Sequence, residues 1–256
     1  MINWKGNGVE NLKDLLESNH ITVFTDGSSY IDKKTDFYEA SSAIVINING
    51  EEIYRFGCYH NNGTNSIGEV YAMMLAIEKV EELKRDNPNL RDYFTVYISD
   101  SKYVVSSLNE WIHGWAALNR YNEVWKSSSN KPIAYQWIMK YLYEKYISKQ
   151  SWQENNLIIH INGHIQSKDI SKYYAKALKR NGKQTWKYQR AITKATFEKL
   201  VQGNNIVDRL AEKIRLNKLF YYEERNENTS WVKRKRRVPT RNQRWIIKSR
   251  KNESRI

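Results

Sequence analysis

Four acidic residues that are far apart in the sequence occupy positions from which a folded chain could bring them together. Asp26 follows the strand-like run ITVFT, and Asp100 follows a second such run, YFTVYIS. The carboxyl ends of neighbouring parallel strands meet at one edge of a sheet, so pairing of these two runs places Asp26 beside Asp100. Glu69 is expected in the first turn of the helix after the third strand, and Asp208 within the final helix. Both helices can add their acids to the same point.

Each of these acids also has a plain structural role when it is considered alone. Asp26 and Gly27 form a common turn dipeptide, and Asp100 is a suitable helix cap. Glu69 would complement a helix dipole, and Asp208 would belong to a solvated face. Taken together, four neighbouring acids repel each other strongly unless cations neutralise them, and oxygen ligands suit Mg²⁺ or Mn²⁺. The group therefore predicts a site where two ions about 4 Å apart bind a phosphodiester.

The hydrophobic pattern predicts the elements that must position these acids. Strands are expected at 21–29, 41–50, 51–59, 93–99 and 157–163, with a hairpin turn at Asn49-Gly50. Helices are expected at 66–85, 100–112, about 111–126, 132–148 and 203–221. Residues 165–202 are expected to form two short helices that are broken at Asn181-Gly182. This order predicts an α/β fold with a five-stranded mixed sheet flanked by helices, and with extra helices in an insertion.

The positive charge of the chain is concentrated in two segments. The 256 residues carry a formal net charge of +14, of which residues 165–202 contribute +8 and residues 225–256 contribute +10, while the remainder is mildly acidic. Such segments favour a polyanion as partner, because each phosphate that is neutralised releases counterions. The alternative is a basic surface that only increases solubility.

Several classes of protein are not expected from this composition. Cys58 is the single cysteine, and no cluster of Cys and His has the spacing of zinc ligands. No apolar run has the length of a membrane span or of a signal peptide core. We therefore expect no disulfide framework, no zinc finger and no membrane partner, and a cytoplasmic location. The many Asn, Lys and Ile residues suggest an AT-rich genome, such as that of a bacterium or a phage.

Five short motifs, taken in order, resemble those of ribonuclease H type 1. They are Thr25-Asp26-Gly27-Ser28, Thr64-Asn65 with Glu69, Ser99-Asp100-Ser101 with Val104, Gly163-His164, and Gly203-Asn204 with Asp208, Leu210 and Ala211. The likeness covers about residues 20–220 and is interrupted by residues 165–202. It implies an RNase H-like fold and an endoribonuclease that hydrolyses the RNA strand of RNA–DNA hybrids, leaving 5′-phosphate and 3′-hydroxyl ends.

The resemblance also implies the roles of the catalytic residues. Asp26, Glu69, Asp100 and Asp208 would hold two Mg²⁺ ions, for which Mn²⁺ is a possible substitute. These ions would activate water and stabilise charge on the departing 3′ oxygen. His164 would relay a proton or help the product to leave; the alternative is a loop histidine without a role.

Substrate contacts are implied by the same resemblance. Gly27, Ser28 and Asn65 would contact the hybrid. The segment 110–132, at the start of an aromatic helical protrusion region assigned to 112–150, resembles the protrusion with which cellular members grip the DNA strand. Its aromatic side would consist of Trp111, Trp115 and Trp125. Packing within a helical hairpin is an equally plain role for these tryptophans. The segment 111–131 has few basic residues, so its grip on DNA is weakly supported by charge.

The main departure from the family is the insertion of 38 residues, 165–202, before the last motif. We divide the chain into a lead-in (1–19), an RNase H domain (20–221) and a basic, flexible tail (222–256). The hypothesis is that the insertion and the tail contact nucleic acid; a protein or ribonucleoprotein partner is the alternative. The whole chain could also be a non-catalytic module that binds hybrid, structured RNA or a protein through its insertion.

Overall fold

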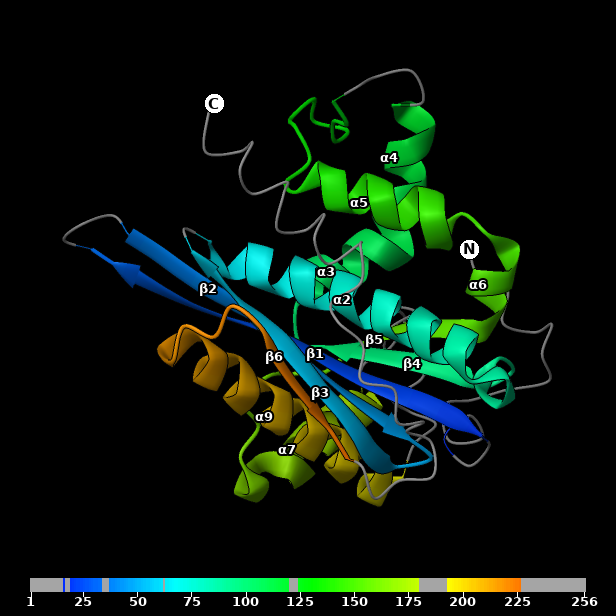
Figure 1. Ribbon diagram of the computed structural model, residues 1–256, viewed down its shortest axis with the longest axis vertical. Helices are drawn as coiled ribbons and strands as arrows, with labels where there is room; N and C mark the ends of the chain where they lie inside the picture. Colours follow the sequence, from blue (N-terminus) through cyan, green and yellow to red (C-terminus); the bar gives the residue numbers. More distant parts are fainter. Residues whose placement is uncertain are drawn as a thin grey trace.

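A single mixed sheet forms the centre of the molecule (Figure 1). The computed structural model describes Leu16 and residues 19–33, 37–61, 63–119, 124–179 and 193–226. Six strands lie in the order β5-β4-β1-β2-β3-β6. Their bounds are β1 His20–Asp32, β2 Phe37–Ile48, β3 Glu51–Asn61, β4 Phe94–Ser99, β5 Asn156–His160 and β6 Tyr222–Arg225. The strands β1, β4 and β5 are parallel to one another, and the remaining pairs are antiparallel.

Helices cover both faces of this sheet (Figure 1). One face carries α2 (Asn65–Asp86), which is followed by the short turn η2 (Pro88–Leu90), and a helical lobe beyond α2. The lobe consists of α3 (Lys102–Ser106), the π-helical turn η3 (Ser107–Trp111), α4 (Ile112–Leu118), α5 (Gln136–Leu142), the π-helical turn η4 (Tyr143–Ile147) and α6 (Gln150–Asn155). The other face carries η5 (Ser167–Asp169), α7 (Ile170–Lys179) and α9 (Lys194–Leu216). None of the helices in the described part of the chain is both long and apolar enough to cross a bilayer.

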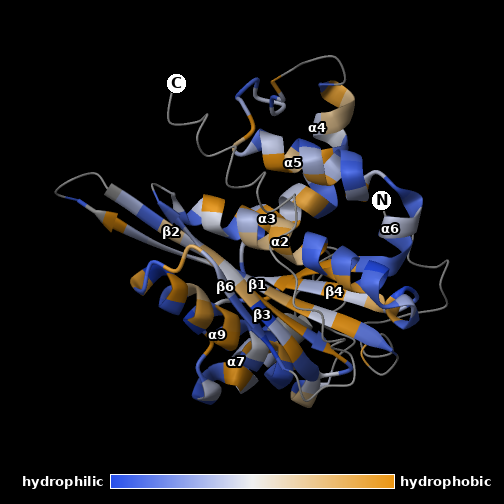
Figure 2. Ribbon diagram, viewed as in Figure 1, coloured by the Kyte–Doolittle hydropathy of each residue, from blue (hydrophilic) through white to orange (hydrophobic). Residues whose placement is uncertain are grey.

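Alternation along the strands divides the core into two clusters. On β1, Val23 faces α2 and belongs to a cluster with Met73, Ile77 and the lobe, whereas Phe24 faces α9 and belongs to a cluster with Val207. Figure 2 shows the apolar residues gathered on the sheet and on the inner sides of these helices. Since both faces of the sheet are covered here, apolar residues occupy neighbouring positions in β1 and β4, such as Val23-Phe24 and Tyr97-Ile98.

The predicted α/β fold is confirmed, with six strands instead of five. The hairpin turn at Asn49-Gly50 is present, with φ of 51° and 85°, the positive values that this dipeptide adopts readily. The helix expected at 66–85 is α2. The additional strand, β6, pairs with the outer edge of β3 and comes from residues that were assigned to the tail. It was missed because its sequence, YEER, contains no β-branched residue.

Several helix boundaries differ from the predictions. The helix expected at 132–148 is the shorter run of α5 and η4 over 136–147, and the final helix ends at Leu216 instead of at residue 221. The helices expected at 100–112 and 111–126 are one continuous helical run over 102–118, because its apolar residues Val104, Val105, Leu108 and Ile112 all reach the core. The final helix begins at Lys194 rather than at 203, because Phe197, Leu200 and Val201 extend its apolar stripe. Thr193 caps this start by accepting a hydrogen bond from the Thr196 backbone N–H. The helix break predicted at Asn181-Gly182, most of the lead-in and residues 227–256 lie outside the described residues.

Candidate active site

Parallel pairing places Asp26 beside Asp100, as the sequence predicts. The ladder between β1 and β4 ends with Thr25 opposite Ser99, and the next residue on each chain is the acid. Asp26 does not end its strand, however, and the prediction of a turn at Asp26-Gly27 is wrong. β1 continues to Asp32 while it pairs with β2, so that β1 extends beyond the end of β4 at this edge of the sheet. The strand continues because β2 supplies a partner on its other side.

Glu69 reaches the same edge from α2, on the opposite face of the sheet from α9. The sequence predicts Glu69 in the first turn of this helix, but it is the fifth residue of α2 and lies just beyond that turn. A Cβ atom on Gly27 would lie 2.5 Å from the Glu69 backbone nitrogen and 2.7 Å from the Gly68 carbonyl carbon. Only glycine at position 27 therefore allows the start of α2 to lie against β1, and this close approach brings Glu69 to Asp26.

Three carboxylates meet in a tight group, in which Asp26 and Glu69 are buried and Asp100 is half-buried. Each of Asp26, Glu69 and Asp100 offers an oxygen within 4.8 Å of the other two. Asp26 and Glu69 are 4% and 6% exposed, and Glu69 Oε2 is buried without a hydrogen-bond partner. Burial raises the pKa of all three acids, and repulsion between the carboxylates adds to the rise. A bound cation would offset this repulsion, and a hard cation fits the oxygen-only donor set of the three acids.

Asp208 lies at the rim of this group on α9. Its charge contributes to the raised pKa of Asp26, Glu69 and Asp100, so Asp208 lies near all three. His164 Nδ1 lies 3.2 Å from Asp208 Oδ2, and the imidazole side chain is 79% exposed. The backbone of His164 is in the left-handed region, with φ of 54°, which is uncommon for a residue with a side chain. All five predicted catalytic residues are thus at one edge of the sheet.

Supporting contacts hold Asp100 in place. His160, the last residue of β5, has Nε2 3.0 Å from the Asp100 carbonyl oxygen. Gly163 lies so close to Asp100 that a Cβ at this position would overlap with the Oδ2 atom. The buried side chain of Asn204 lowers the pKa of Asp100 against the larger effect of burial. The support by His160 was not foreseen, since a histidine at a strand end gives no specific signal in the sequence.

The comparison with known families agrees with this geometry. The sequence matches the RNase H family, described as "RNase H", over residues 18–215. The chain belongs to the RNase H family. A curated ribonuclease H of Nitrosomonas eutropha is 28% identical over 114 residues, which are 44% of this chain and 62% of the relative. A ribonuclease H of Cupriavidus metallidurans is 29% identical over 113 residues, 44% of this chain and 65% of the relative. The chain thus spans about three fifths of the length of these curated relatives.

A solved structure with a similar fold is that of a foamy viral protease-reverse transcriptase in complex with dsDNA. Its TM-score is 0.51 at 17% sequence identity, and the alignment covers 79% of this chain and 97% of the other. At this identity the likeness concerns the fold alone. It supports the arrangement of the RNase H domain described above, with helices on both faces of a mixed sheet.

The predicted substrate residues of the RNase H domain have different surroundings. Asn65 is exposed at the first position of α2. Ser28 is partly buried, and its hydroxyl accepts a hydrogen bond of 3.0 Å from Arg215 Nε, so the hydroxyl hydrogen is available to another acceptor. The Gly27 backbone N–H lowers the pKa of Asp26 and Glu69 against the effect of burial, which indicates that it points at the acids. Arg215 lies seven residues after Asp208 on α9, a helical spacing that could have revealed it.

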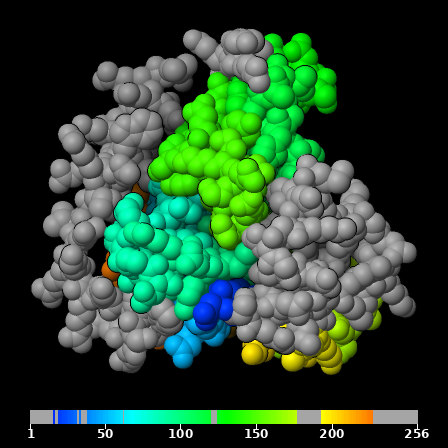
Figure 3. Space-filling view, turned by 90° about the vertical axis from the view of Figure 1, so that its right-hand side faces the viewer, coloured from blue at the N-terminus to red at the C-terminus, as the bar shows by residue number. Residues whose placement is uncertain are grey.

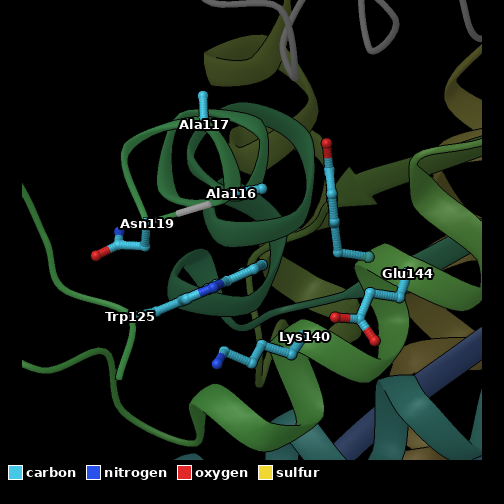
Figure 4. Close-up of a pocket in the computed structure, with 7 residues that line it drawn as sticks. Ala116, Ala117, Asn119, Trp125, Lys140 and Glu144 are labelled. Atoms are coloured by element: carbon cyan, nitrogen blue, oxygen red, sulfur yellow. The ribbon is translucent and has the colours of Figure 1, made fainter. Parts of the chain in front are cut away.

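The three tryptophans of the lobe are not equivalent. Trp111 is 42% exposed and lies 5.8 Å from the half-buried ring of Trp115. Trp125 is 5% exposed and packs in the core, which leaves little of its ring for a nucleic acid base. Lys140 Nζ lies 5.7 Å from the centre of the Trp125 ring, and both residues line a cavity of about 310 Å³ together with Glu144 (Figure 4). Packing therefore accounts for Trp125, and Trp111 is the exposed aromatic residue of the three.

Proposed function

We propose that the protein is a metal-dependent endoribonuclease that hydrolyses the RNA strand of RNA–DNA hybrids and leaves 5′-phosphate and 3′-hydroxyl ends. The observation that carries the proposal is the group of Asp26, Glu69 and Asp100, each of which offers an oxygen within 4.8 Å of the other two. Membership of the RNase H family and the position of Asp208 beside this group support it. A polyanion substrate agrees with the net charge of +14. We place this activity in the cytoplasm of a bacterial or phage-infected cell.

The four acids would hold two Mg²⁺ ions, for which Mn²⁺ could substitute. The unpartnered Glu69 Oε2 and the raised pKa of three of the acids fit such a donor set. When bound, the ions would activate water and neutralise charge at the scissile phosphate. His164 is exposed and paired with Asp208, so its ring can carry a proton between this edge of the sheet and solvent. Ser28, Asn65, Trp111 and Trp115 remain the proposed substrate contacts, with the Gly27 backbone facing the acids.

The exposed lysines of the insertion are a proposed second contact with nucleic acid. Ile170, the first residue of α7, is buried, and the ring of Tyr174 lies 5.6 Å from that of Phe197 on α9. This packing leaves a row of exposed lysines at spacings of four residues, which we call the α7 lysine row: Lys168, Lys172 and Lys176. Figure 3 shows the lobe at the top and the residues of α7 and early α9 at the bottom of the molecule. The row therefore offers positive charge on the side opposite to the lobe.

A cleavage assay tests the proposed function. The protein is incubated with end-labelled RNA–DNA hybrid, duplex RNA or duplex DNA, in Mg²⁺ or in EDTA. We expect cleavage of the RNA strand of the hybrid in Mg²⁺ only. The Asp100→Asn variant should lose cleavage but retain hybrid binding, because it removes a negative charge with almost no change of shape. Hybrid binding without cleavage by the native protein would instead indicate a non-catalytic RNase H-like module.

A further inference from the structure

Two adjacent serines of β2 connect the sheet to the helices on its two faces. Neighbouring residues of a strand point to opposite faces, and Ser41 and Ser42 are both fully buried. The Ser42 hydroxyl donates a hydrogen bond of 2.7 Å to the Gly68 carbonyl in α2. The Ser41 hydroxyl donates a hydrogen bond of 2.6 Å to the Ala211 carbonyl in α9. One short segment of β2 is thus bonded to both helices that supply acids.

The two bonded carbonyls lie next to the acids in the sequence and in space. Gly68 immediately precedes Glu69, and Ala211 follows Asp208 by three residues, less than one helical turn. In the ladder between β1 and β2, Ser42 is opposite Gly27, and the adjacent pair joins Asp26 to Ala43. The positions of Glu69 and Asp208 are therefore both defined relative to the strand that pairs with Asp26.

These hydrogen bonds add to the helical bonds instead of replacing them. A carbonyl oxygen has two lone pairs and can accept from a serine as well as from the helical N–H four residues later. His60 Nε2 lies 2.7 Å from Ser42 Oγ, and the single hydroxyl hydrogen is donated to Gly68. His60 Nε2 is consequently the donor in the second bond, and it fixes the orientation of the hydroxyl. A buried hydroxyl without a partner costs free energy, which makes the bonded arrangement the stable one.

We propose that Ser41 and Ser42 are positioning residues, which hold α9 and α2 against the sheet so that Asp208 and Glu69 stay within reach of one metal centre. The repulsion among the four acids acts in the opposite direction, since it favours movement of each helix away from β1. The ladder fixes Asp26, and β4 fixes Asp100, but Glu69 and Asp208 depend on how their helices pack. The proposal rests on the proposed function, because it assumes that these acids bind metal.

The test compares Ser41→Ala and Ser42→Ala with a matched control, Thr95→Val. Thr95 is also fully buried in the sheet, but its hydroxyl has no hydrogen-bond partner, and the residue lies five positions before Asp100. Mn²⁺ binding is measured by isothermal titration calorimetry on the full chain without nucleic acid. We expect each serine variant to weaken Mn²⁺ binding on the order of tenfold, the usual effect of losing a partner that orients a ligand. Thr95→Val should bind Mn²⁺ as the native protein does.

Melting in EDTA and hybrid cleavage distinguish a positioning role from a purely stabilising one. A lower melting temperature with native Mn²⁺ affinity would show that the serines only stabilise the fold, and would overturn the proposal. A lower kcat with an unchanged KM for hybrid would support it, because misplaced acids impair the reaction and not the binding of the duplex. If the native protein binds Mn²⁺ but cuts no hybrid, the proposed function fails, while the serine comparison still decides the positioning role. Absence of Mn²⁺ binding by the native protein would remove both.

Discussion

Replacement of Gly163 by alanine tests whether the exact position of the Asp100 carboxylate matters. The new Cβ would overlap with Asp100 Oδ2 and would lie 3.0 Å from Cγ and 3.4 Å from Cβ of the same side chain. Gly163 is not among the residues with positive φ, so alanine is compatible with its backbone. The substitution therefore acts through this one contact. Van der Waals separation requires the carboxylate oxygen to move by at least about 1 Å.

The consequences for stability and for function should differ greatly in size. Only the end of one side chain must move, so we expect a loss of about 1 kcal/mol in the free energy of unfolding, the low end for overpacking. A displacement of about 1 Å at a reacting centre can reduce the rate roughly 100-fold. Loss of alignment of one metal ligand should also weaken Mn²⁺ binding roughly tenfold. Activity is thus expected to fall far more than stability.

The assay measures hybrid cleavage at several Mg²⁺ concentrations and thermal melting in EDTA. The control is Gly114→Ala, because a Cβ on Gly114 would have no atom within 4 Å. Gly114 lies inside α4, so this variant should gain about 0.5–1 kcal/mol of stability and keep native Mn²⁺ affinity. Native cleavage and native Mn²⁺ affinity in Gly163→Ala would refute the reasoning, because Asp100 would then tolerate displacement.

Three further predictions concern pH, proton transfer and salt. Folding raises the pKa of Asp26, Glu69 and Asp100, so the folded state binds more protons than the unfolded state. In EDTA, the melting temperature should therefore fall as the pH rises above about 4, the ordinary pKa of these acids. Addition of Mg²⁺ at pH 8 should restore the melting temperature. Melting in EDTA that is independent of pH would contradict the burial of ionisable acids. His164→Ala should slow cleavage on the order of 100-fold with native hybrid affinity, and a native rate would remove His164 from the mechanism. Changing the three lysines of the α7 lysine row to glutamine should reduce the slope of log hybrid affinity against log salt concentration by about 2–3. The same change at Arg85, Arg91 and Lys149, which precede the starts of β4 and β5 in the sequence, should have little effect on this slope.

The sequence predicts the central pair of the site but not the depth at which it is buried. Two apolar runs that each end in an acid are enough to predict Asp26 beside Asp100, because parallel pairing is a regular geometry. The prediction of a turn at Asp26-Gly27 fails because the pairing of β1 with β2 beyond this point is set by tertiary contacts. The sequence also does not show that α2 lies so close to β1 that only glycine fits at position 27.

The supporting residues could not be identified from the sequence for a different reason. Ser41 and Ser42 stand in a strand where polar residues usually face solvent, and their burial depends on two helices that lie far away in the sequence. The start of α9 was missed because a basic segment obscures the apolar positions Phe197 and Val201. Patterns of local spacing therefore predicted the elements, whereas contacts across long sequence distances determined how the acids are held.

The contact between His164 and Asp208 is compatible with the proposed insertion of residues 165–202 beside it. Ile165 is buried, and its carbonyl accepts a hydrogen bond of 3.0 Å from Asn205 Nδ2 on α9. The loop that carries His164 is therefore attached directly to the helix that carries Asp208, three residues before that acid. The free-energy cost of lengthening a loop rises only slowly with its length. The hydrogen bond between Asn205 and Ile165 involves no residue of α7. The segment between Ile165 and α9 can therefore vary in length while His164 and Asp208 keep their contact.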